Sequence, residues 1–160
     1  MIRQDYILDL IEQAVRFLTQ ALNLEQAGEV EQAHRALEQA GQQLVGMRLS
    51  LAAQMDPDTL LLLMRAPDGS LDEGRAMVLG ALLTRRAMLM TGEVERRRHF
   101  LAAVSLLTAL DQESTRRLPV ETLHDLEAGA RSIGVDWMPF RLRARVEALR
   151  GQAVALADEE

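Results

Sequence analysis

Two groups of arginines are the residues of this chain best suited to bind a ligand. Arg85 and Arg86 fall within a stretch otherwise rich in leucine and methionine, and Arg96 and Arg98 open the next apolar stretch after Gly92. The planar guanidinium group pairs with carboxylates and phosphates. An unpaired charge inside a protein is unfavourable by several kcal/mol. We therefore weigh two interpretations of the first pair: internal ion pairs with neighbouring helices, or a clamp for an anion in a groove.

Arg96 and Arg98 have acidic neighbours that offer a simpler explanation of their presence. They belong to a run of charges that includes Glu93 and Glu95, and such a run is usually a solvated helix face. Alternatively, they extend the preceding arginine pair into one basic patch around Gly92. The formal net charge of −6 argues against a general nucleic-acid surface, so we do not expect nucleic acid as the partner.

Catalytic and metal-binding patterns are weak in this chain. Glu31–His34 and Glu121–His124 have the Glu-x-x-His spacing of di-metal carboxylate bundles, but helical periodicity places these side chains outside the buried face. There is no cysteine and no lysine, which excludes thiolate sites and lysine chemistry. No Ser–His–Asp order or glycine-rich phosphate loop occurs. We expect no enzymatic activity, no metal and no cofactor.

The elements that position these residues are predicted to be helices. The chain has 160 residues, enough for one domain with a real core, and only 3% of them are aromatic. A core of Leu, Ala, Val and Met favours helices over strands, and no stretch alternates with period two. Acidic residues interrupt the N-terminus, where a secretory signal would need an uncharged apolar run. No charge-free segment approaches the ~20 residues that span a bilayer. We expect an all-α, cytoplasmic protein of about seven helices.

The tetrapeptide Gly-Glu-Val-Glu occurs twice, beginning at Gly28 and again at Gly92. A glycine that ends one helix, followed by an acidic start to the next, is typical of a helical hairpin. The spacing of the copies corresponds to about two ~34-residue units of a helical-repeat scaffold. It predicts hairpin repeats at about 5–46 and 71–111, followed by capping helices at 119–157.

Several local signals predict where the helices begin and end. Gly46 is expected to end the second helix. Asp56 is expected to cap a short helix through 60–64, with Pro57 in its first turn. Ser70 and Glu73 have the form of a capping box for a helix over 71–91 that is buried on nearly all sides between 76 and 83. Pro119 is expected to open another helix. The large apolar residues of 137–140 are predicted to fill a space in the core. The last helix is predicted to carry an apolar seam over 142–156.

The segment from Phe17 to Ala40 resembles a tetratricopeptide repeat. The resemblance rests on large, small and turn residues at the repeat's packing positions, which are Phe17, Ala21, Leu24, Gly28, Val30, Ala33, Leu37 and Ala40. The second copy departs from the pattern, because arginines stand at its crossing position and at its small-residue position. The first ~45 residues also resemble an uncharacterised family of small bacterial helical proteins. This resemblance extends beyond the ~34 residues of a single repeat. Both resemblances imply a role through protein contact.

An apolar stripe on the first helix is the remaining candidate for a binding surface. Val15, Leu18 and Leu22 lie on the side that faces the groove in a tetratricopeptide repeat, where polar or mixed residues are usual. If exposed, the stripe would be an adhesive patch. We expect the short helix of 60–64 or the C-terminal helix to cover it, or else a partner or a second copy. The sequence therefore predicts a protein-interaction or assembly module; the alternative is an anion- or nucleic-acid-binding regulator that uses the arginines.

Overall fold

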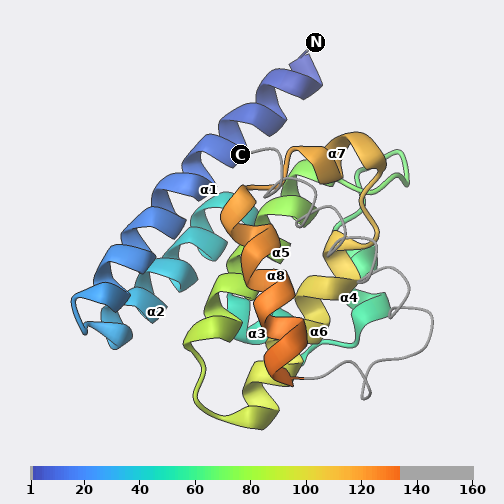
Figure 1. The fold of residues 1–160 in the computed structure, drawn as a ribbon. Helices are drawn as coiled ribbons and strands as arrows, with labels where there is room; N and C mark the ends of the chain where they lie inside the picture. The colour runs from blue at the N-terminus through green and yellow to red at the C-terminus, as the bar shows by residue number, and fades with distance from the viewer. Residues whose placement is uncertain (1, 134–160) are drawn as a thin grey trace.

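The computed structural model of the protein describes residues 2–133, which form eight α-helices and one π-helical segment (Figure 1). The elements are α1 (Ile2–Gln26), α2 (Val30–Ala40), the π-helical η1 (Gly41–Val45), α3 (Leu49–Gln54), α4 (Pro57–Leu63), α5 (Glu73–Leu89), α6 (Glu93–Leu107), α7 (Gln112–Arg116) and α8 (Val120–Ile133). No β-strand occurs in this range, which confirms the all-α prediction. Among these helices, none combines the length and apolar character needed to span a bilayer.

Helix α5 is the centre of the core. Every residue from Ala76 to Thr84 is buried, which confirms the prediction of a helix enclosed on nearly all sides. The α1–α2 hairpin packs along one side of α5, α6 packs along another, and α8 crosses it on a further face (Figure 1). Helix α5 therefore holds α1, α2, α6 and α8 together.

A glycine allows α5 and α6 to approach each other closely. A Cβ atom at Gly80 would lie 2.6 Å from Cδ2 of Leu107, a side chain that is fully buried in α6. Because real Cβ atoms do not come this close to a neighbour, only glycine fits at this crossing without a rearrangement. The hydroxyl of Thr84, one turn further on, donates to the carbonyl oxygen of Gly80 at 2.7 Å, so this buried polar side chain is satisfied within α5.

The first Gly-Glu-Val-Glu copy ends a helix as predicted. Gly28 has φ +81°, in the left-handed region that favours glycine. Its N–H donates to the carbonyl oxygen of Glu25 at 3.0 Å, and the N–H of Glu29 donates to that of Leu24 at 2.8 Å. These two bonds form a Schellman motif, which satisfies the last carbonyls of α1 and turns the chain into α2.

The second copy has a different structure. Helix α5 ends at Leu89, and Gly92 is the N-cap of α6, with φ −75° in extended backbone. The prediction that Gly92 ends the preceding helix is therefore wrong: the glycine begins the next one. Glycine is acceptable at an N-cap as well as at a helix end, so its identity does not distinguish the two roles.

The other predicted helix boundaries are partly confirmed. Gly46 ends the helical backbone of α2 and η1 with φ 80°, as expected. Pro57 occupies the first turn of α4, but the Asp56 side chain makes no capping hydrogen bond. The capping box at Ser70 is wrong, because Asp72 is the N-cap of α5 and its Oδ1 accepts from the N–H of Arg75 at 3.2 Å. The hydroxyl of Ser70 donates to Asp68 within the preceding turn instead.

Three elements were not anticipated, and two predictions lie beyond the described range. The short helices α3 and α7 and the π-helical segment η1 were not predicted. Helix α6 ends at Leu107, earlier than the expected 111, and a helix does begin directly after Pro119. The apolar residues of 137–140 and the seam over 142–156 lie outside the residues that the structure describes.

Candidate partner-binding groove

A partly open groove of about 360 Å³ lies between α1 and α8, with the end of α5 at its base. Its lining comes from three helices that are far apart in the sequence: Val15, Leu18, Thr19 and Leu22 of α1, Arg85 of α5, and Val120, Glu121, Thr122, His124 and Asp125 of α8. The structure thus brings the predicted apolar stripe together with one of the predicted arginines.

The wall from α1 is apolar, as the stripe predicted. Leu18 is buried, whereas Val15 remains 37% exposed and Leu22 is half-buried. Of the two helices expected to cover this stripe, α4 does not, because it packs on α6, and the C-terminal helix predicted over 142–156 lies outside the described residues. Helix α8 instead faces the stripe across the groove and contributes Val120, which is also 37% exposed. Apolar side chains therefore remain accessible on both walls.

Arg85 forms the polar base of the groove by joining three helices. Its Nη1 donates to both carboxylate oxygens of Asp125, at 3.2 Å each, and its Nη2 donates to Glu25 of α1. The side chains of Arg85 and Asp125 are only 15% and 16% exposed. The interpretation of Arg85 as the centre of internal ion pairs is confirmed. Its charge is already balanced by two carboxylates, so it has little capacity to clamp a further anion.

Asp125 has a raised pKa although it is paired with an arginine. Burial of the carboxyl group is the largest cause, and the nearby carboxylates Glu25 and Glu121 raise it further. The charge and hydrogen bond of Arg85 lower the pKa but do not outweigh these effects. Carboxylates thus outnumber the single guanidinium group at this end of the groove.

Arg86 points away from the groove into a second polar cluster. Its Nη1 donates to Oε1 of Glu38 in α2 at 2.7 Å. The same carboxylate accepts from the backbone N–H and the hydroxyl of Ser50 in α3, at 3.2 Å each. The ion-pair interpretation is therefore confirmed for Arg86 too. Arg85 and Arg86 belong to different clusters and do not form a joint clamp.

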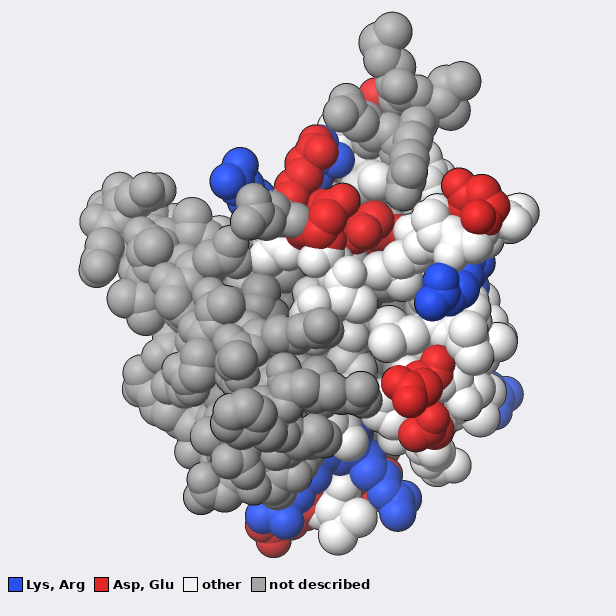
Figure 2. Space-filling model, turned by 90° about the vertical axis from the view of Figure 1, so that its right-hand side faces the viewer, with Lys and Arg blue, Asp and Glu red and all other residues white. Residues whose placement is uncertain are grey.

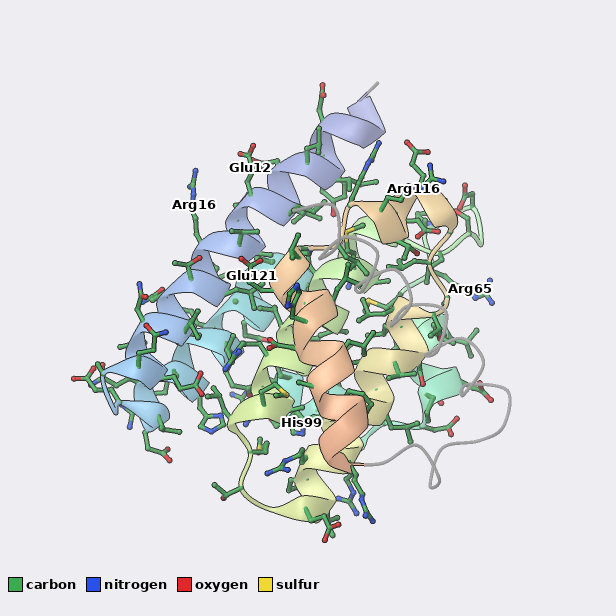
Figure 3. All side chains as sticks on the ribbon, in the orientation of Figure 1. Glu12, Arg16, Arg65, His99, Arg116 and Glu121 are labelled. Carbon is green, nitrogen blue, oxygen red and sulfur yellow. The ribbon has the colours of Figure 1, made fainter. Side chains whose placement is uncertain are left out.

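His99 is buried beside this second cluster, and Figure 3 labels it behind α8. Its Nδ1–H donates to the carbonyl oxygen of Glu95 at 2.8 Å, whereas its Nε2 is buried and has no hydrogen-bond partner among the described residues. Burial is the main cause that lowers the pKa of His99; the charge of Arg86 lowers it too, while the bond to Glu95 and the carboxylate of Glu38 act in the opposite direction. The ring is therefore neutral in the folded protein at neutral pH.

We expect the buried His99 to make stability fall in mild acid. Because its pKa in the folded state lies below the ordinary value of 6.5, the unfolded chain binds more protons below that value. The contribution of His99 to the free energy of unfolding is fully present above pH 6.5. It decreases, by up to about 1.4 kcal/mol per pH unit, as the pH falls towards the folded-state pKa. Urea unfolding between pH 7.5 and 5 measures the slope. His99→Gln should reduce it, and an unchanged slope would contradict the assignment.

The arginines around Gly92 are held by local partners. Arg96 donates through Nε and Nη2 to the carbonyl oxygen of Met90, at 3.2 and 3.0 Å, which satisfies an end group of α5. Arg97 pairs with Glu93 at 2.7 Å, and Arg98 lies 3.6 Å from Glu95. Figure 2 shows basic and acidic side chains directly beside each other at the lower edge of the molecule, where α6 begins in Figure 1. The structure does not join this cluster to Arg85 or Arg86.

The two Glu-x-x-His sequences lie on solvent-facing surfaces. Glu31, Glu121 and His124 are exposed, and His34 is half-buried. Within the described residues, no three His, Asp or Glu side chains form a group that could hold a metal ion. Glu121 and His124 instead line the rim of the groove.

Some groove residues were missed by sequence reasoning. Glu25 and Asp125 lie 60 positions before and 40 positions after Arg85, and no local pattern marks them as its partners. The amphipathic pattern of 120–126 predicted a helix at this position but not the helix that it would face. In comparisons with family models, with curated proteins and with solved structures, no match to this chain is found.

Proposed function

We propose that this protein is a non-catalytic interaction module that receives an apolar helical segment of another protein in the groove between α1 and α8. The observation that carries this proposal is the accessible apolar lining, formed by Val15 and Leu22 on one wall and Val120 on the other. An amphipathic helix that lays its apolar face into such a groove is a recurring mode of peptide recognition.

The polar residues of the groove support binding better than catalysis. A catalytic carboxylate needs an oxygen that is free to exchange a proton with substrate. Both carboxylate oxygens of Asp125 accept hydrogen bonds from Arg85, so this side chain serves to join α5 and α8. The resemblance of 17–40 to a tetratricopeptide repeat points in the same direction, since such repeats act through protein contacts.

The alternative, an anion- or nucleic-acid-binding regulator, has less support. It requires arginines with uncompensated charge, because phosphate binding depends on neutralising phosphates with free basic groups. Arg85, Arg86, Arg97 and Arg98 all have carboxylate partners, and Arg96 donates to a backbone carbonyl. Those pairs would have to break before an anion could bind.

The test compares the proteins that are retained from native cells by tagged wild-type protein and by variants with an added charge inside or outside the groove. Val15→Asp places a charge on the apolar wall, at a side chain exposed enough for the fold to tolerate it. Leu8→Asp is the matched control, because Leu8 is 48% exposed on the same helix but does not line the groove. We expect the wild type and Leu8→Asp to retain a partner protein. Val15→Asp should retain about tenfold less of it, which corresponds to ~1.4 kcal/mol of binding free energy.

The outcomes separate the candidate functions. Equal retention by both variants would contradict docking in this groove. Companions that disappear after nuclease treatment would favour the nucleic-acid alternative. Retention of untagged copies of the chain alone would identify self-assembly as the function, with a second copy as the partner. Circular dichroism of both variants checks that the fold is intact.

A further inference from the structure

The charge of the groove identifies the kind of segment that fits it, and this step rests on the function proposed above. Arg85 is the one arginine among the described lining residues, and its charge is shared between Glu25 and Asp125. Glu121 lines the same groove. The polar end of the groove therefore carries an excess of negative charge beside an apolar wall.

Glu121 is the carboxylate available to a partner. It is exposed, and no residue of the described range forms a salt bridge with it. Figure 3 shows it in the first turn of α8, on the side towards α1, so that it borders the groove. A basic side chain next to the apolar face of an incoming helix would reach this carboxylate while its apolar neighbours contact Val15 and Leu22.

We propose that the groove selects amphipathic helical segments that carry an arginine or lysine beside their apolar face. An acidic segment would meet Glu121 and Asp125 as like charges, and Arg85 has no spare charge to offset that repulsion. This differs from the interpretation in which Arg85 and Arg86 form a clamp for an anion, because both arginines are already paired with carboxylates. Complementary charge at an interface rim acts mainly on specificity and on the rate of association.

The test measures binding of designed helical peptides to the full chain. Three fluorescein-labelled peptides, each the 14-residue length of α8, share one leucine face and differ at a single flanking position that is Arg, Gln or Glu. An exposed ion pair contributes about 0.2–1 kcal/mol, so we expect affinity to fall by about threefold at each step from Arg to Gln to Glu. The differences should vanish at high salt, which screens exposed charges.

A charge reversal supplies the decisive comparison. Glu121→Arg should invert the order, so that the Glu peptide binds most tightly. Glu12→Arg makes the same change in net charge on an exposed residue of α1 that does not line the groove and should leave the order unchanged (Figure 3). Anisotropy titrations at low ionic strength, where surface electrostatics is strongest, measure all combinations.

The contradicting outcomes are distinct. Equal binding of the three peptides, abolished by Val15→Asp, would overturn the charge selection and leave the docking function standing. Binding that Val15→Asp does not change, or no binding of any peptide, would overturn the docking function as well.

Discussion

Replacing Arg85 with methionine should lower the free energy of unfolding by about 3 kcal/mol at neutral pH, because it leaves a buried carboxylate without its partner. Asp125 is only 16% exposed and accepts from Arg85 through both oxygens. Methionine keeps much of the apolar stem, so the loss reports on the charge and hydrogen bonds rather than on packing. Thermal unfolding should show a decrease of about 2–4 °C for each kcal/mol.

The size of this effect distinguishes the buried cluster from an ordinary surface pair. Arg98→Met is the matched control, since Arg98 pairs with Glu95 at the surface, where both side chains are about half exposed. That variant should lose less than about 1 kcal/mol. Removing both charges with Arg85→Met and Asp125→Leu should restore much of the stability, because the more deeply buried carboxylate is then absent and Glu25, the other partner of Arg85, is 33% exposed to solvent. Equal losses from the two single arginine variants would contradict the structural role of Arg85.

The pH dependence gives this prediction a second readout. The pKa of Asp125 is already raised, and loss of the neighbouring guanidinium group would raise it further. The variant can then relieve the buried charge by protonating Asp125, so its deficit against the wild type should shrink as the pH is lowered towards 5. A stability deficit that is the same at neutral pH and near pH 5 would indicate lost packing instead.

The central helix was predictable because its signal is local and redundant. The stretch from Ala76 to Leu83 is apolar without a polar face, and that pattern has one stable solution in a soluble protein, namely burial. Gly28 was predictable for a similar reason, because a glycine between two amphipathic stretches commonly occupies the left-handed position that ends a helix. Gly92 has the same following residues but caps the next helix, which shows that a tetrapeptide alone does not determine its backbone.

Only some of the missed parts depend on contacts between distant segments. Helix α3 begins at Leu49, and the side chain of its N-cap residue, Arg48, makes no capping hydrogen bond, so the sequence holds no start signal for it. Helix α7 does have one, because Asp111 caps it by accepting from the N–H of Ser114 at 2.7 Å. That signal is recognisable in retrospect as an Asp directly before a polar turn. The partners of Arg85 follow only from the way α1, α5 and α8 pack together.

Phe100→Ala should lower the free energy of unfolding by about 3–5 kcal/mol, the range observed when a fully buried aromatic ring is removed. Phe100 is completely buried in α6, and a Cβ atom at Gly129 would lie 2.6 Å from its Cε2, so α8 rests directly on the ring.

The effect of Phe100→Ala should extend to the groove, because α8 forms one of its walls. Removing the ring leaves a cavity beneath α8, and we expect faster hydrogen exchange in 120–133 and weaker peptide binding together with the loss of stability. Val94→Ala, on the same helix but 63% exposed, should change stability by less than about 0.5 kcal/mol. If Phe100→Ala destabilised the protein while exchange in α8 stayed at the wild-type rate, the ring would support α5 and α6 alone. The groove would then depend on the ion pairs of Arg85 to hold α8 in place.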